Sequence, residues 1–127
     1  MGSVMLDTNR LSERRAHPRV PVKLLVKYKM FESDEESMSV PEPQKKFRTS
    51  HTQDVSLGGL FLVTDQALGV DDFLRLDISL PEHSPEIHTF AVVVWTNRKG
   101  GGLHFEAIKN EDVETLRRCL SRINAVL

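Results

Sequence analysis

The sequence contains a single cysteine, one tryptophan and one tyrosine, and it has no long hydrophobic run. Because Cys119 has no second cysteine to pair with in the chain, no internal disulfide forms, and we expect a protein of a reducing compartment. No apolar stretch approaches the roughly 20 residues that a membrane-spanning helix needs, so we expect no membrane insertion. The N-terminus also lacks the apolar segment of a signal peptide. Together these absences predict a cytoplasmic protein.

The chain also has little net charge, which is −1 over 127 residues and argues against general affinity for DNA or RNA. The charges are nevertheless unevenly placed. Residues 10–29 contain one acid, Glu13, and seven bases: Arg10, Arg14, Arg15, Arg19, Lys23, Lys27 and Lys29. Residues 32–43 contain five acids and no base. A local excess of arginine suits a phosphate-bearing partner.

Alternation of apolar and polar residues predicts strands along most of the chain. The expected strands span residues 20–30, 47–55, 60–64, 73–80, 87–97 and 102–108, with a turn at residues 98–101. In the first, Val20, Val22, Leu24, Val26, Tyr28 and Met30 share one face. The length fits one domain, and six consecutive short strands indicate a sandwich or a small closed barrel.

Three segments depart from this pattern. Residues 1–13 have no periodicity, and we expect a flexible tail. The Ser- and Pro-rich acidic stretch at residues 32–46 predicts a poorly ordered loop. Residues 110–126 have the spacing of an amphipathic helix, with Asn110 as its N-cap. Its apolar stripe must pack on the barrel end or on a second subunit. The stripe consists of Val113, Leu116, Leu120, Ile123 and Leu127.

Two clusters carry residue types suited to binding an anion. Arg14, Arg15 and Arg19 lie on an extended segment before the first strand, and arginine offers a planar fork of donors for phosphate oxygens or a guanine edge. Asp54 and Ser56 lie two residues apart at a strand end, followed by glycines that let a ligand approach the backbone. Taken alone, the first cluster also fits a solvated tail, and the second an ordinary turn.

The two clusters occur in the order of a known signature, R-x-x-x-R followed by [D/N]-x-S-x-x-G, and the chain therefore resembles the PilZ domain family. Arg15 and Arg19 match the first part, and Asp54, Ser56 and Gly59 match the second. The segments GLFLV and VVVWTNRKGGGLHFEAI also resemble strands of that family, and the likeness extends over residues 13–120. The resemblance implies a PilZ domain at residues 14–127: an all-β, six-stranded antiparallel PilZ-type β-barrel with a C-terminal helix.

The resemblance also implies a receptor for cyclic di-GMP, which carries two phosphates and two guanines. Arg15 and Arg19 would bind guanine edges and phosphates, while Arg14 would stack on a base and accompany a stacked pair of ligands. Asp54 would accept hydrogen bonds from guanine. The further expected ligand contacts are Ser56, Gly59 and Trp95. Trp95 fits a core or helix-docking position equally well.

We therefore expect a non-enzymatic switch without metal or cofactor, in which the ligand orders the arginine arm and creates a surface for a downstream protein. No zinc-ligand spacing or nucleophile motif is visible in the sequence. A PilZ-like adaptor that binds no nucleotide is the alternative, and a barrel for single-stranded nucleic acid ranks below it, because such proteins present several exposed aromatics. The protein would act as a monomer or a homodimer.

Overall fold

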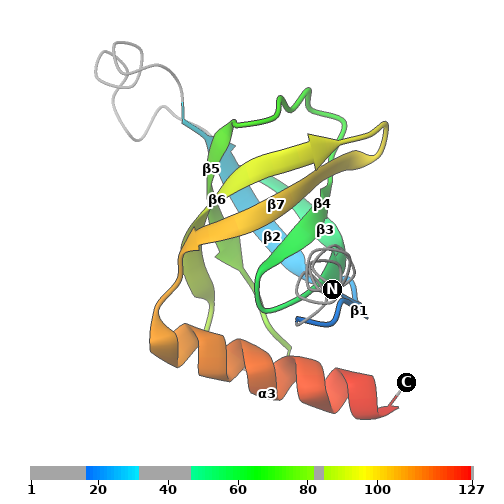
Figure 1. Cartoon of the computed structure of the whole chain (residues 1–127), viewed down its shortest axis with the longest axis vertical. Coiled ribbons are helices and arrows are strands. Elements are labelled where there is room, and N and C mark those ends of the chain that lie inside the picture. The colour runs from blue at the N-terminus through cyan, green and yellow to red at the C-terminus, as the bar shows by residue number, and fades with distance from the viewer. Residues whose placement is uncertain (1–16, 32–46, 82–84, 127) are drawn as a thin grey trace, which may run out of the picture.

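The computed structural model describes residues 17–31, 47–81 and 85–126, which form seven strands and one helix (Figure 1). The elements are β1 (Val20–Pro21), β2 (Leu25–Met30), β3 (Arg48–Val55), β4 (Gly59–Val63), β5 (Phe73–Ile78), β6 (Ile87–Thr96), β7 (Gly100–Ala107) and α3 (Asn110–Val126). The expected tail at residues 1–13 and acidic loop at residues 32–46 lie outside the described residues.

The strands form one antiparallel sheet that closes on itself. Their order is β1-β3-β2-β5-β6-β7-β4, and β4 also pairs with β3. This last pairing closes strands β2 to β7 into a barrel, and β1 pairs with the C-terminal end of β3. Because β1 and β2 together correspond to the first expected strand, the prediction of a six-stranded antiparallel barrel with a C-terminal helix is confirmed.

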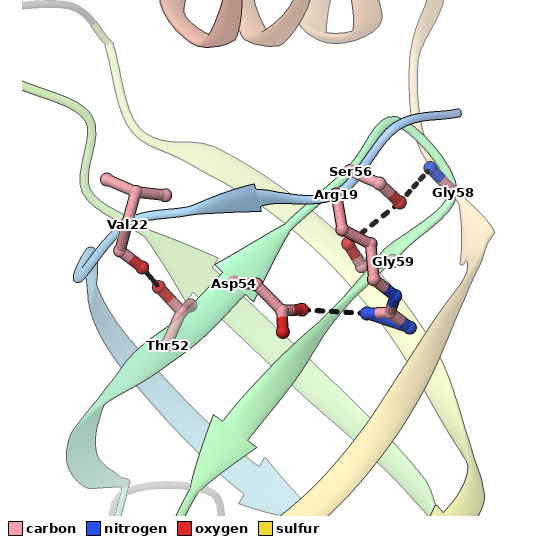
Figure 2. Close-up of polar contacts among 7 residues, drawn as sticks. All are labelled: Arg19, Val22, Thr52, Asp54, Ser56, Gly58 and Gly59. Atoms are coloured by element: carbon pink, nitrogen blue, oxygen red, sulfur yellow. Dashed lines mark hydrogen bonds and ion pairs between the residues drawn. The ribbon is translucent and has the colours of Figure 1, made fainter. Parts of the chain in front are cut away.

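The first expected strand, residues 20–30, is not continuous. It breaks between Pro21 and Leu25, where two backbone hydrogen bonds to β3 remain and the Thr52 hydroxyl adds two more. That hydroxyl donates to the Val22 carbonyl at 2.6 Å (Figure 2). It also accepts from the Leu24 amide at 2.9 Å. The apolar face is as expected, since Val20, Leu24, Val26 and Tyr28 are buried, with Val22 and Met30 partly buried against them. The side chains follow the pattern although the backbone ladder does not.

The last strand begins earlier than its sequence indicates. Gly100 and Gly101 were expected in the turn at residues 98–101, but both belong to β7, and Gly101 pairs with Thr96. The turn is instead closed by Asn97. Its side-chain oxygen accepts from the amides of Lys99 and Gly100 at 2.8 and 3.1 Å. Bare glycine backbone therefore forms the start of a barrel strand.

Helix α3 lies across one end of the barrel (Figure 1). Leu116, Cys119 and Leu120 are buried there and belong to the same core as the inward residues of the strands. The barrel end therefore covers this part of the apolar stripe without a second subunit. On the exposed side, Arg117 lies 3.4 Å from Glu114, one turn earlier. Within the described ranges, no helix is long and apolar enough to span a membrane.

Candidate ligand-binding site

A one-residue bulge in β3 places Asp54 on the outer surface of the barrel. Thr52 pairs with Leu62, and Asp54 pairs with Phe61, so Gln53 is an extra residue between the two pairs. Leu62 is in the core and Thr52 is buried, which means that regular alternation would turn Asp54 inward as well. A bulge reverses this phase and re-aims the side chain that follows it. The carboxylate consequently faces outside the barrel.

Arg19 meets Asp54 on this outer surface (Figure 2). The residue precedes β1, whose pairing with β3 sets Pro21 opposite Asp54. Nη1 of Arg19 lies 2.7 Å from Oδ1 of Asp54, and the two side chains are 49% and 21% exposed. An exposed ion pair of this kind stabilises a fold by only about 0–1 kcal/mol. The contact thus joins the two parts of the sequence signature without being a major source of stability.

Ser56 lies in the turn between β3 and β4 and is engaged by that turn. Its side chain is 7% exposed. The hydroxyl accepts from the Gly58 amide at 3.1 Å and lies 3.4 Å from the Gly59 carbonyl, while the Ser56 amide donates to that same carbonyl at 2.8 Å (Figure 2). The serine therefore shapes the turn that presents the signature residues.

Gly59 is a close-approach position between β4 and β7. A Cβ atom at this residue would lie 1.9 Å from the Leu103 carbonyl oxygen and 3.2 Å from the Cα atom of His104. Neither backbone atom could move aside without separating the two strands. The expectation was that Gly59 leaves room for a ligand, and its missing side chain also leaves room for the neighbouring strand.

An open cleft of about 970 Å³ lies on the outer surface around these residues. The cleft is lined by four of the residues that the sequence predicted for the site: Arg19, Ser56, Gly59 and Trp95. Trp95 is 43% exposed, so its alternative placement in the barrel core is wrong. Asp54 does not line the cleft itself but holds Arg19, which does. Arg14 and Arg15 lie outside the described residues.

The cleft also contains residues that the sequence did not single out, notably His17, Val94 and His104. His104 faces outward, because its neighbours Leu103 and Phe105 belong to the core, and it pairs directly with Gly59. Alternation along the last strand predicts an outward histidine. Its position beside the signature glycine follows only from the pairing of β4 with β7, which are distant in sequence.

The cleft presents side chains of the kinds that contact anionic groups and flat rings. It combines a guanidinium, two imidazoles and an exposed indole. Guanidinium groups bind phosphate oxygens and guanine edges, and an indole stacks on flat rings. Among residues 17–31, 47–81 and 85–126, no three His, Cys, Asp or Glu side chains are grouped so as to hold a metal ion.

Comparison with known families decides what this barrel is. The family model of the PilZ domain matches residues 13–122. The chain belongs to the PilZ domain family. The match includes the arginine segment, the signature around Asp54 and most of helix α3, so the PilZ domain includes both the cleft and the barrel that supports it.

Two solved structures resemble the chain over most of its length. The structure of the Bacillus subtilis inhibitor of motility (MotI/DgrA) is 26% identical, with a TM-score of 0.65. The alignment covers 86% of this chain and 51% of the other, so this PilZ chain spans about half the length of that protein. The PilZ domain of CeSA from a cellulose synthesizing bacterium is 14% identical, with a TM-score of 0.56 over 84% of this chain and 97% of the other. The second likeness shows the fold alone. No curated protein sequence matches the chain.

Proposed function

We propose that this PilZ domain is a receptor for cyclic di-GMP. The observation that carries the proposal is the convergence of the signature residues on one surface: Arg19, Ser56 and Gly59 line a single cleft, and Arg19 is held by Asp54. The cleft volume of about 970 Å³ lies at the upper end of the roughly 300–1,000 Å³ typical of small-molecule pockets. A compact dinucleotide with two guanines and two phosphates fits this size and this set of donors.

Arg19 is the main contact for the ligand. A guanidinium has five N–H donors, and the ion pair with Asp54 uses one nitrogen on a side chain that stays half exposed. The remaining donors are available to the O6 and N7 atoms of guanine or to a phosphate. Asp54 orients this fork in the free protein and accepts from the guanine N1 and N2 groups in the complex. Each bidentate arginine–guanine contact contributes about 1–3 kcal/mol.

Arg15 and Arg14 complete the site from the N-terminal side. Residue 17 lines the cleft, and Arg15 is two residues away, at most about 7 Å of extended chain. A guanidinium on a long side chain reaches the ligand phosphates from there. Binding neutralises the repulsion among three arginines and fixes the arm across the cleft, a transition from disorder to order that creates a new surface.

That surface is where the signal leaves the domain. We assign the protein the role of a non-enzymatic adaptor that passes ligand binding on to a downstream protein, as a monomer or a homodimer in the cytoplasm. The similarity to a motility inhibitor, which extends over half of that protein, is consistent with an adaptor that acts on a partner.

The test is calorimetric titration of cyclic di-GMP into the purified protein, with GTP as the control nucleotide. We expect saturable binding that Arg15→Ala/Arg19→Ala abolishes. The matched control is Arg48→Ala, which also removes an exposed arginine paired with an acid, Asp65, but outside the cleft. It should bind like wild type.

A folded wild-type protein that releases no heat at tens of micromolar ligand would contradict the receptor function. The domain would then be a nucleotide-independent adaptor. Equal binding of GTP would show an unspecific phosphate site instead, and loss of binding in Arg48→Ala would place the ligand outside this cleft.

A further inference from the structure

Trp95 reaches the cleft only because β6 contains a bulge. Val93 pairs with Leu103, and Trp95 pairs with Gly102, so Val94 is the extra residue between the two pairs. Val93 is fully buried in the core, and regular alternation would place Trp95 on that same inner face. The bulge turns the indole to the outer surface, where it lines the cleft.

The indole lies flat against bare backbone of the neighbouring strand. A Cβ atom at Gly102 would be 2.1 Å from Nε1 of Trp95 and 2.6 Å from Cε2. Contacts between heavy atoms this short do not occur, so any side chain at this position must displace the ring. The absence of a side chain at Gly102 therefore creates the space in which the pyrrole part of the indole lies.

Phe61 supports the same ring from β4. It pairs directly with Gly102 and lies outside the core cluster that contains its neighbours Leu60 and Leu62. It is nevertheless only 2% exposed. Its ring centroid is 5.2 Å from that of Trp95, at an interplanar angle of 43°. Aromatic pairs at this separation attract one another. Phe61 and Gly102 thus both contact the indole, while 43% of Trp95 stays exposed on the cleft side.

We infer that Gly102 and Phe61 are positioning residues, which hold Trp95 as a fixed stacking wall for one guanine base of the ligand. The inference rests on the proposed function. A ring that is already immobilised loses little freedom when a base stacks on it, so more of the stacking energy appears as affinity. Neither positioning residue needs to touch the ligand, and both act through Trp95.

The placement of the ring is tested in the free protein by the fluorescence of Trp95, which is the only tryptophan of the chain. We expect Gly102→Ala to shift the emission to longer wavelength and to increase quenching by acrylamide, with Phe61→Leu changing both in the same direction. The matched control is Gly101→Ala on the same strand. Its new Cβ would meet the flexible end of Leu68 at 2.9 Å, on the core side, and leave the indole in place. Unchanged emission and quenching in Gly102→Ala would contradict the position of the indole over Gly102.

The role in binding is tested by a double-mutant cycle with cyclic di-GMP, using wild type, Gly102→Ala, Trp95→Ala and the double variant, each shown to be folded by circular dichroism. With Trp95 present, we expect Gly102→Ala to raise Kd about tenfold, the effect of losing one base-stacking contact. Without Trp95, the same change should alter Kd less than twofold, because the ring that it displaces is gone.

The outcomes separate the two proposals. An equal loss of affinity in both backgrounds would show that Gly102 acts through the strand and would overturn the positioning role. If the wild type does not bind but Gly102→Ala changes the fluorescence, the receptor function and the stacking role are both contradicted. The position of the indole over Gly102 would still be supported.

Discussion

Nη1 of Arg19 lies 2.7 Å from Oδ1 of Asp54, and this contact joins the two parts of the PilZ signature across 35 residues of sequence. It forms because β1 pairs with the end of β3 and because a bulge turns Asp54 to the outer surface. The Arg19–Asp54 part of the proposed ligand site is therefore already formed by the fold, and we propose that ligand binding adds the N-terminal arm.

The planar geometry of the Arg19 guanidinium, and not its charge alone, should determine the affinity for cyclic di-GMP. We expect Arg19→Lys to weaken cyclic di-GMP binding about 5- to 150-fold, because an ammonium cannot contact guanine O6 and N7 in bidentate fashion. Stability in urea should change by less than about 1 kcal/mol, since the ion pair is exposed. Calorimetry and urea unfolding measure the two effects. Wild-type affinity in Arg19→Lys would show that the ligand requires only a positive charge at this position. The matched control is Arg48→Lys.

Ser56 should matter for stability as well as for binding. In Ser56→Ala the Gly58 amide loses its side-chain acceptor in a partly buried turn, and the loss of such a hydrogen bond costs about 0.5–1.5 kcal/mol. We expect the free energy of unfolding in urea to fall by that amount. Ser79→Ala removes a hydroxyl that donates to Glu86 in an exposed hydrogen bond, and it should have an effect below about 0.5 kcal/mol. Equal stability of the two variants would argue against the role of Ser56 in the turn.

Arg14 should set the number of ligands bound. The resemblance to the PilZ family associates an arginine at this position with a stacked pair of cyclic di-GMP molecules. We expect two ligands per protomer in the wild type and one in Arg14→Ala, read from the stoichiometry of the calorimetric titration. Arg10→Ala, a change in the same basic segment but outside the signature, should retain two. A ratio of one in the wild type would contradict the prediction.

The attachment of α3 to the barrel should be a large contribution to stability. Leu116 is fully buried in the core at the barrel end, and deleting such a side chain typically lowers the free energy of unfolding by about 2–5 kcal/mol. We expect this loss in Leu116→Ala by urea denaturation. Arg118→Ala, on the exposed side of the same helix, should change stability by less than about 0.5 kcal/mol. Similar losses in both variants would mean that helix propensity, not packing, is being measured.

Much of the barrel follows from local sequence patterns. The alternation from Val20 to Met30 identifies the buried face of the first strand even where the ladder breaks, because burial depends on side-chain polarity and not on every backbone hydrogen bond. The spacing of Leu116 and Leu120 likewise predicts the helix and its buried side. The six-stranded fold and the family were both predicted from the sequence and confirmed.

The orientation of two site residues could not be predicted in this way. Alternation of apolar and polar residues predicts which face of the sheet a residue occupies only as long as no extra residue interrupts the strand. Asp54 and Trp95 each follow a single extra residue that reverses the phase. The stretch around Val93 is apolar on both faces, so its composition does not show where the reversal occurs.

By itself, then, the sequence determined the strands, the helix, the inward face of the barrel and the residues of the signature, since these depend on neighbours a few positions apart. Only the tertiary structure decided that Arg19 meets Asp54, that His104 lies beside Gly59 and that Trp95 lies over Gly102. These contacts join strands that are distant in the chain, and they depend on the closure and the bulges of the barrel, whose register no local pattern encodes.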